Sequence, residues 1–357
     1  MTRVRLVADA DEWDSLVLNF PDADVRQSYA WGEVRAEVGW RPVRMAAFDG
    51  PRCVAAMGVL ARRLPGFGTV LDAPRGPLLD PESGAAWVGL RRLLRGVGAE
   101  TRAVLLRLSP GVGAEHQPFA RALRACGLRP LDGAWTDWNL PRRVMRLPLA
   151  GTEADVLRRM AKPRRRRVLA NREVQVEVSP ALEGVRAFYA LLVTHARVRG
   201  YPIRAWSYFA ALHRHFAPTG GVVVVLGRVR GEVVSAQIGL RFGPMALAIN
   251  APGTLTARGV AATEVVQWEW IRWAKAAGCE TIDFGPSATE GIARFKIEMG
   301  CDPVLCVPYF DCPYAPLRYR LVRFAEETAF PRLRPLAAAA CRALRRRSTP
   351  APLPRPA

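Results

Sequence analysis

The apolar and polar positions of the chain predict the same series of elements twice. In the first half, apolar residues at helical or alternating spacing predict helices over 27–38, 82–98 and 118–127 and strands over 41–49, 52–64, 68–73 and 103–109. In the second half, helical stripes that include Phe188 and Phe209 precede strand-like runs over 221–229, 232–243 and 245–251, a helix over 260–278 and a strand over 280–285. Both halves therefore run from helices through three strands to a helix and a further strand.

Polar residues and glycines mark several helix ends. Ser28 and Thr152 stand where N-cap side chains are expected, and Gly127 and Gly278 follow the last helical residues. Strands followed by helices in this order are typical of an α+β fold. We expect two tandem units, each with a mixed, mainly antiparallel sheet flanked by helices.

The division of the chain follows from the same pattern. Residues 1–148 form the first predicted unit and residues 149–308 the second, because Pro148 and Gly151 interrupt the pattern between them. We expect residues 309–345 to form C-terminal helices that complete the first unit, and the proline-rich residues 346–357 to be a disordered tail. No sustained apolar heptads occur between 150 and 220, so no coiled-coil arm is expected.

The composition is that of a globular protein with enough apolar material for two cores. Half of the 357 residues are apolar, with 10 Trp and 13 Phe. The chain has no apolar run of about 18 residues, and acidic residues occupy the place of a signal peptide's apolar segment, so we expect a cytoplasmic protein. The 7 cysteines and 4 histidines lack the spacing of a disulfide framework or a metal site, and neither is predicted.

The formal net charge of +20 predicts attraction to polyanions, which include nucleic acid, anionic lipid and phosphorylated substrates. A merely solvated basic surface has the same composition, so charge alone does not separate these classes. Of the 52 basic residues only Lys162, Lys275 and Lys296 are lysines, which leaves 49 arginines. An ammonium is a compact charge whose pKa shifts on burial, whereas a guanidinium stays charged, so a lysine retained in such a chain suggests a specific task.

Six short stretches carry a family resemblance over roughly residues 25–305. In chain order they read QSYAWGEVRAEVGW, PRGPLLD, KPRRRRVLANREVQVEV, RAWSYFAAL, WEWIRWAKAAGCETIDFG and GIARFKIEMG. Their order and spacing resemble the Fem family (FemABX-like) of peptidoglycan interpeptide-bridge aminoacyltransferases, which pair two acetyltransferase-like (GNAT) domains. The resemblance implies transfer of an amino acid from the 3′ ester of an aminoacyl-tRNA to an amine on the stem peptide of a cell-wall precursor.

The resemblance also implies site residues. Lys296 and Phe295 match the family's Phe-Lys pair, in which the lysine serves the transfer, by stabilising an oxyanion or passing a proton, and the aromatic ring contacts the tRNA end. Arg204, Tyr208 and Arg35 match residues that hold the precursor's phosphates, and the first two are four residues apart, hence on one face of a helix. Ordinary core packing and solvation are the alternatives for these side chains.

Other stretches fit the family less closely. The basic residues Lys162, Arg164, Arg165 and Arg166 match a basic segment that implies contact with tRNA or membrane phosphates, with a solvated face as the equal alternative. The stretch 256–263 resembles the loop by which GNAT enzymes hold acyl-CoA, but it contains a single glycine. The ending DFGPS at 283–287 departs from the family's DFGG type, and ALAINAPGT lacks a tyrosine that the family often shows.

Three hypotheses follow. The first is a tRNA-dependent aminoacyltransferase for a lipid-linked or nucleotide-linked peptidoglycan precursor, monomeric, with aminoacyl-tRNA as co-substrate and no other cofactor. The second is an acyl-CoA-dependent N-acyltransferase in cell-envelope or polysaccharide modification, and the third is a non-catalytic basic protein that binds tRNA or membrane. The basic residues 334–347 favour peripheral contact with the anionic inner face of the plasma membrane. The amino acid transferred, the acceptor amine and the form of the precursor stay open.

Overall fold

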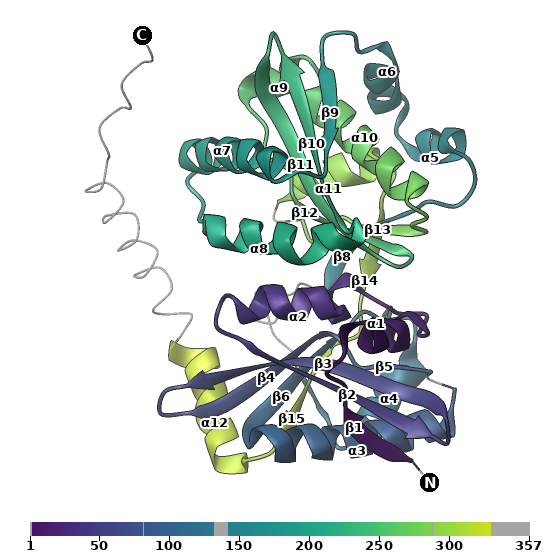
Figure 1. Ribbon diagram of the computed structural model, residues 1–357, viewed down its shortest axis with the longest axis vertical. Coiled ribbons are helices and arrows are strands. Elements are labelled where there is room, and N and C mark those ends of the chain that lie inside the picture. Colours follow the sequence, from purple (N-terminus) through teal and green to yellow (C-terminus); the bar gives the residue numbers. More distant parts are fainter. Residues whose placement is uncertain (1, 81, 132–141, 288, 330–357) are drawn as a thin grey trace.

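The structure is a computed structural model that describes residues 2–80, 82–131, 142–287 and 289–329. Two sheets, each flanked by helices, lie one above the other, and helix α2 (Tyr29–Ala36) lies between them (Figure 1). We call the sheet nearer the N-terminus, with its helices, the first unit and the other the second unit. The predicted tail at 346–357 lies outside the described residues.

The first sheet contains strands from both ends of the described chain. Its order is β1 (Arg3–Leu6), β2 (Arg41–Asp49), β3 (Arg52–Leu64), β4 (Gly68–Arg75), β6 (Ala103–Pro110), β15 (Tyr309–Pro313) and β7 (Arg129–Leu131), and β5 (Leu78–Leu79) pairs with β3. The helices of this unit are α1 (Ala10–Leu18), α2, α3 (Gly84–Thr101), α4 (Gln117–Ala125) and α12 (Pro316–Phe324).

The second sheet has the order β14 (Asp302–Leu305), β8 (Arg143–Pro148), β13 (Thr281–Asp283), β12 (Met245–Asn250), β11 (Glu232–Phe242), β10 (Val222–Val229) and β9 (Gln175–Ser179). Its helices are α5 (Glu153–Arg159), α6 (Lys162–Ala170), α7 (Leu182–Arg199), α8 (Trp206–Phe216), α9 (Leu255–Gly259), α10 (Ala262–Ala276) and α11 (Glu290–Glu298).

The two sheets repeat one plan. In each, neighbouring strands are mostly antiparallel, but the strand before the long helix pairs in parallel with the strand after it, β4 with β6 across α3 and β12 with β13 across α10. A parallel pair needs a crossover connection, which these helices supply. The predicted α+β fold of two mixed sheets flanked by helices is confirmed, and no long coiled-coil arm occurs in the described ranges.

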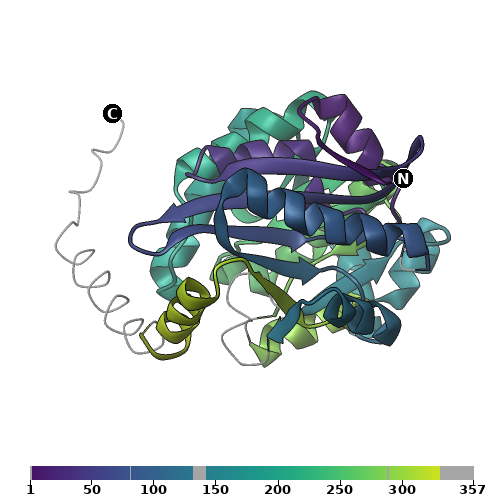
Figure 2. The same cartoon turned by 90° about the horizontal axis from the view of Figure 1, so that it is seen from below.

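The long helices cover the sheets with the apolar faces that their sequences present. Leu90, Leu93 and Val97 of α3 are fully buried against the first sheet, which the helix crosses in the view from below (Figure 2). Val266 and Trp270 of α10 are buried in the same way against the second sheet. The spacing of three and four residues places these side chains on one side of each helix, so the periodicity alone locates both cores.

Two predicted helix starts are confirmed in atomic detail. Ser28 Oγ accepts a hydrogen bond from Trp31 N at 3.2 Å at the start of α2. Thr152 caps α5 and forms a capping box with Asp155, in which each side chain accepts from the other residue's backbone N–H. Both caps satisfy backbone donors that the first turn of a helix leaves without an internal partner.

The structure corrects one prediction and refines another. Residues 309–313 were expected to be helical, but they form β15 between β6 and β7, and helix begins only at Pro316. The buried Asp311 in this short run hides its strand character in the sequence. The predicted domain limits stay predictions, although strand pairing assigns Arg143–Pro148 to the second sheet and Tyr309–Pro313 to the first.

The two units share an apolar contact. Val25 and Val34 of the first unit are fully buried in one cluster with Tyr208 and Phe209 of α8 in the second unit. Because α2 packs on α8 through these side chains, the charged residues around the contact are held between the two units.

A partly buried ion pair fastens β15 into the first sheet. The Nε and Nη2 atoms of Arg107 on β6 each donate to an Asp311 carboxylate oxygen at 2.9 Å, and Arg107 also pairs with Glu326 at 3.0 Å. Asp311 is fully buried. Two parallel N–H···O bonds are the strongest geometry that an arginine and a carboxylate form.

We predict that Asp311→Ala lowers the free energy of unfolding by about 3 kcal/mol, because the partly buried Arg107 guanidinium loses one of its two bidentate carboxylate partners and keeps Glu326. Chemical denaturation measures this loss. The matched control is Glu177→Ala, which breaks the Arg228–Glu177 ion pair. Because this pair is more exposed than Arg107–Asp311, its loss should lower the free energy of unfolding by less than about 1 kcal/mol. Equal losses in the two variants would contradict the proposed role of the Arg107–Asp311 pair.

Candidate functional site

Charged side chains from both units meet where the units face each other. We call this region the seam and define it by Asp24, Arg26, Arg35 and Asp72 of the first unit and Arg204, Tyr208, Asp283 and Lys296 of the second. Tyr208 and Asp283 are buried, whereas Arg35 and Lys296 are half-buried. The seam therefore combines buried side chains with cationic groups that solvent can reach.

A buried charged triad joins the units. Arg26 Nη1 lies 3.0 Å from both carboxylate oxygens of Asp24 and 3.2 Å from Oδ2 of Asp283, the last residue of β13. Burial alone would raise the pKa of Asp283, but Arg26 and then Arg75 outweigh it and hold this pKa below its ordinary value. Asp283 is therefore a carboxylate at neutral pH, and it ties the end of a second-unit strand to the first unit.

Asp283 also shapes the turn that follows it. Its Oδ1 accepts a hydrogen bond from Gly285 N at 2.6 Å, and Gly285 has a φ of +67°, which a side chain disfavours. The carbonyl oxygens of this turn point to a single cation. Lys296 Nζ lies 2.7 Å from Phe284 O, 2.6 Å from Pro286 O and 3.4 Å from Gly285 O.

Lys296 is thus fixed by backbone carbonyls rather than by a carboxylate. Helix α11 presents it, and Thr289 caps that helix by accepting from Ile292 N at 3.3 Å. Burial lowers the pKa of the Lys296 ammonium, while Cys301 and Asp283 act in the opposite direction. The arrangement gives a cation that can donate hydrogen bonds and whose proton is less firmly held than that of a solvated lysine.

Arg35, Arg204 and Tyr208 form a second part of the seam, and the structure brings all three together. The Cζ atom of Arg204 lies 4.5 Å from the centre of the Tyr208 ring. Burial and then the nearby Arg204 lower the pKa of Arg35. Neither guanidinium forms an ion pair among the residues that the structure describes. Two close, unpaired guanidinium groups are suited to bind an anion with more than one oxygen.

The helix prediction around Arg204 needs a correction. Helix α8 begins at Trp206, after an extended Ala205, so Arg204 lies in the segment before the helix and not on its face. Pro202 in this segment favours extended backbone in its neighbourhood. Arg204 still reaches the Tyr208 ring because its side chain folds back over the first turn.

Phe295 and the basic helix α6 lie beside Lys296 rather than in the seam itself. The Phe295 ring packs against the second core, with Arg164 Cζ 5.0 Å from its centre. Arg164 is paired with Glu264 and, at 2.9 Å, with Glu298 of α11. Of the four predicted contact residues on α6, Arg164 is therefore held internally.

The other three predicted residues of α6 are on its outer side. Lys162 and Arg166 are exposed, and half-buried Arg165 donates to the backbone oxygen of Arg158 at 3.5 Å. Helix α6 lies at the far end of the second unit from α2 (Figure 1). The structure thus separates this basic surface from Arg35 and Arg204.

Sequence reasoning missed two features of the seam. Asp72 of β4 has a pKa raised to about 6 by burial, against the effect of Arg107 and Arg35, so it can accept a proton near neutral pH. The Asp24–Arg26–Asp283 triad joins residues 257 positions apart. The run PDADVRQS before α2 gave no signal, because an acidic and a basic residue two positions apart in a loop are common on any surface.

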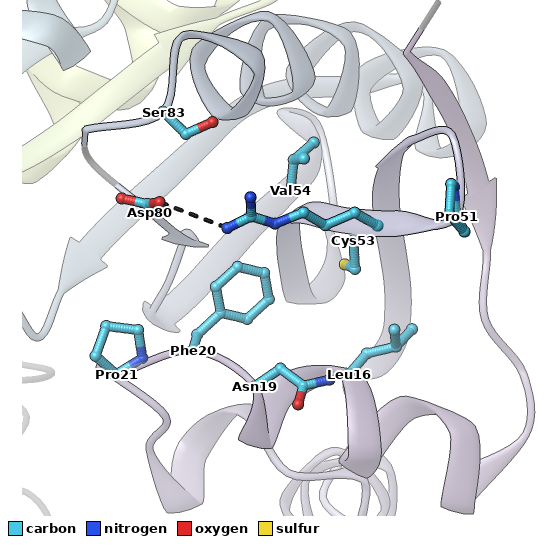
Figure 3. Close-up of a pocket in the computed structure, with 10 residues that line it drawn as sticks. Leu16, Asn19, Phe20, Pro21, Pro51, Cys53, Val54, Asp80 and Ser83 are labelled. Atoms are coloured by element: carbon cyan, nitrogen blue, oxygen red, sulfur yellow. Dashed lines mark ion pairs between the residues drawn. The ribbon is translucent and has the colours of Figure 1, made fainter.

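One cavity of the first unit lies away from the seam. It encloses about 560 Å³ in the first unit between Leu16, Phe20 and Cys53, with Arg52 and Asp80 3.8 Å apart at its rim (Figure 3). Burial raises the pKa of the Cys53 thiol to about 11, so it is no thiolate nucleophile at neutral pH. None of the predicted site residues lines this cavity, and we place the candidate site in the seam.

Neither a metal site nor a membrane-spanning helix occurs in the described ranges. No group of three or more His, Cys, Asp or Glu side chains there could hold a metal ion. No helix in these ranges is long and apolar enough to cross a membrane.

Comparisons with known proteins agree with this architecture. Residues 156–296 match a family model described as an acetyltransferase (GNAT) domain. A lipid II:glycine glycyltransferase of Staphylococcus saprophyticus subsp. saprophyticus is 24% identical over 228 residues, which cover 62% of this chain and 55% of that protein. One of Staphylococcus haemolyticus is 23% identical over 234 residues, 64% of this chain and 56% of that protein. The chain thus spans about half the length of these curated relatives.

Solved structures show the same fold. The crystal structure of FemX superposes with a TM-score of 0.82 at 18% identity, over 90% of this chain and 99% of that one. A tandem GNAT protein from the clavulanic acid biosynthesis pathway gives a TM-score of 0.52 at 12% identity, over 88% and 98% of the two chains. The predicted pair of tandem GNAT-like units is therefore confirmed.

We predict that Lys296 titrates below the ordinary lysine value of 10.5, because burial disfavours its charged form. With three lysines in the chain, NMR of protein labelled at the lysine Cε gives three signals to follow with pH, and Lys296→Met identifies one of them. Asp283→Asn should lower the midpoint further, since the carboxylate favours the ammonium. A Lys296 midpoint at or above 10.5, or an upward shift in the Asp283 variant, would contradict the prediction.

Proposed function

This chain belongs to the Fem family, and we propose that it transfers an amino acid from an aminoacyl-tRNA to an amine on the stem peptide of a peptidoglycan precursor. The observation that carries the proposal is the fixed, half-buried Lys296, whose Nζ donates into the carbonyl turn at 284–286 on the edge of the seam. The relatives named lipid II:glycine glycyltransferase support the choice of acceptor.

The chemistry is an aminolysis of an ester. The neutral amine of the stem peptide attacks the carbonyl carbon of the aminoacyl ester, and a C–N bond forms. The resulting tetrahedral oxyanion collapses, the C–O bond to the tRNA 3′ oxygen breaks, and the amine proton passes to that leaving oxygen. The step requires no redox partner, and its main electrostatic demand is a positioned donor for the oxyanion.

Lys296 meets that demand in the proposed mechanism. Two of its contacts are short, and the third, to Gly285 O, is 3.4 Å long. We assign the hydrogen of this long contact to the oxyanion, since replacing a weak hydrogen bond costs least. The lowered pKa of the ammonium also brings its proton affinity closer to that of the leaving oxygen, so that Lys296 can pass a proton to it.

We assign the acceptor's phosphates to the unpaired guanidinium groups of Arg35 and Arg204. Arg204 is exposed and lies over the Tyr208 ring, whereas Arg35 is half-buried and lies over the Trp40 ring. A diphosphate has several oxygens that can accept from both guanidinium groups, and its negative charge offsets the repulsion between them. In this arrangement the precursor lies along the seam, with its diphosphate at α2 and α8 and its stem peptide directed towards Lys296.

The donor binds on the α11 side. We assign Phe295 as the aromatic contact of the terminal adenosine, with Arg164 already above its ring, and the exposed Lys162 and Arg166, together with Arg165, as contacts of the tRNA phosphates. No cofactor is needed beyond the aminoacyl-tRNA.

An acyl-CoA donor is the second candidate, since residues 156–296 match an acetyltransferase model. In GNAT enzymes the CoA pyrophosphate binds at a helix N-terminus. Here the first turn of α10 carries Glu264, which is buried and paired with Arg164 and Arg167. A carboxylate in this turn already occupies the positive end of the helix, and this favours tRNA over CoA as the donor.

We predict that Lys296→Met lowers transfer on the order of 10² to 10³-fold, the effect of losing one oxyanion donor. The assay supplies total charged tRNA with lipid-linked or nucleotide-linked pentapeptide precursor, and acyl-CoAs in parallel, and identifies products by mass. Lys275→Met is the matched control, because Lys275 Nζ also donates to backbone carbonyls, at 2.7 Å to Leu149 O, but away from the seam. Products formed only with acyl-CoA would refute the tRNA-dependent reaction.

We predict a different defect for Arg204→Ala, namely a KM for the precursor raised roughly ten- to a hundredfold with kcat nearly unchanged, since a charge-assisted contact to phosphate is lost from ground and transition state alike. Arg186→Ala is the matched control. Arg186 is on α7, its Cζ lies 5.2 Å from the ring of Trp206 at the start of α8, and it is exposed like Arg204. If both variants raise KM alike, general surface charge and not a phosphate subsite is responsible.

A further inference from the structure

Helix α12 presents apolar side chains on two opposite sides. Tyr319 and Val322 are buried against Val104 and Leu105 of the first sheet, which explains how the helix is attached. Leu317, Leu321 and Phe324 follow at intervals of four and three residues and are 76%, 60% and 66% exposed. A helix needs one apolar side to pack on its own protein, so the second stripe has no such explanation.

The turn between β3 and β4 extends this apolar surface. Phe67 at its tip is exposed, and a Cβ placed on Gly68 would lie 3.8 Å from Nη1 of Arg318 on α12. Figures 1 and 2 both show the hairpin end beside α12. We call the surface formed by these side chains the apolar-basic face; it comprises Phe67, Leu317, Leu321 and Phe324 with the arginines Arg62, Arg318 and Arg320, and Arg62 is included because it pairs with Val70, which packs against α12.

The arginines of this face are available to an external anion. Arg62, Arg318 and Arg320 are exposed, and none of them forms an ion pair within the described part of the chain. Exposed apolar side chains bordered by unpaired cations complement the surface of an anionic bilayer. The apolar side chains enter the boundary of the acyl chains, and the cations contact the anionic headgroups. A protein partner fits this surface less well, because charged residues are depleted at the centre of protein–protein interfaces.

The apolar-basic face is continuous with the proposed phosphate subsite. The ring of Trp40 lies between two arginines, with Arg35 Cζ at 5.4 Å and Arg62 Cζ at 5.5 Å from its centre. Trp40, Arg62 and Arg63 also line a pocket of about 320 Å³ together with Arg41 and Thr69. A row of arginines and an aromatic ring thus leads from Arg35 in the seam to the hairpin beside α12.

We propose that the apolar-basic face docks on an anionic lipid bilayer and that the acceptor is the lipid-linked form of the precursor. The second part rests on the proposed function. With the diphosphate at Arg35 and Arg204, the lipid chain attached to it would leave along Trp40 and Arg62 towards the membrane. A nucleotide-linked precursor has no apolar chain and gains nothing from this surface.

Vesicle cosedimentation of the full-length protein tests the docking. Vesicles of phosphatidylcholine alone are compared with vesicles that contain about one-third phosphatidylglycerol, at low and high salt. We expect binding to the anionic vesicles that weakens with salt, and about tenfold or more weaker binding for the double variant Leu321→Ser with Phe324→Ser. The matched control is Val198→Ser with Leu255→Ser, two side chains that are 73% and 72% exposed elsewhere, and it should bind like the unmodified protein.

Three results would overturn the docking proposal. They are absence of binding by the unmodified protein, unchanged binding by the α12 variant, and a dimer in sedimentation that the α12 variant loses. Because the substituted side chains are largely exposed, thermal unfolding of the variant should match that of the unmodified protein, and this measurement excludes misfolding as the cause of weak binding.

Transfer assays separate this inference from the proposed function. The α12 variant should lose about tenfold in transfer to lipid-linked precursor in anionic vesicles and keep its rate with nucleotide-linked precursor in solution. An equal loss with both acceptors would refute a membrane role for α12. If the unmodified protein modifies neither acceptor with any charged tRNA, the proposed function fails, while the vesicle result still decides the docking.

Discussion

The buried triad of Asp24, Arg26 and Asp283 is the constraint on which the arrangement of the two units depends. Each of these groups is costly to remove from water alone, and together they are satisfied only when β13 and the segment before α2 are in contact. Apolar packing of α2 on α8 supplies attraction but little direction. The triad fixes which residues face each other, and through the Asp283–Gly285 hydrogen bond it fixes the carbonyl turn that holds Lys296.

The structure also explains why a chain with 49 arginines has lysine at two of its three lysine positions. The planar fork of arginine matches carboxylates, as in the pairing of Arg107 with Asp311, whereas the three donors of an ammonium match a ring of carbonyl oxygens. Lys275 and Lys296 are both bound by backbone carbonyls. They differ in surroundings, because Lys296 lies in the seam near the Asp283 carboxylate, whereas Lys275 does not. The ammonium thus meets a requirement of local geometry, and the chemical role that we propose for Lys296 rests on its place in the seam.

Local patterns in the sequence were sufficient for most of the fold. The strands β2, β3, β10 and β11 and the helices α3 and α10 follow from periodicity over eight or more residues, and Ser28 and Thr152 mark helix starts because capping is a local interaction. Strand β15 was missed because it is short and centred on a charged residue whose partner, Arg107, is 204 positions away. Arg35, Arg204 and Tyr208 could be proposed from motifs, but the triad and the raised pKa of Asp72 arise only from tertiary contact.

The positions of the two proposed substrate surfaces bear on how two large polyanions can be bound at once. The proposed path of the precursor runs through Arg35, Trp40 and Arg62 on the first unit, whereas Phe295 of α11 and helix α6 belong to the second unit. The precursor and the tRNA are both polyanions and repel one another. If they bind from two sides of the protein, their phosphates stay apart while the reacting ester and amine meet. In the proposed arrangement Lys296 stands where the two paths join, and the triad of Asp24, Arg26 and Asp283 holds the two units in the register that this meeting requires.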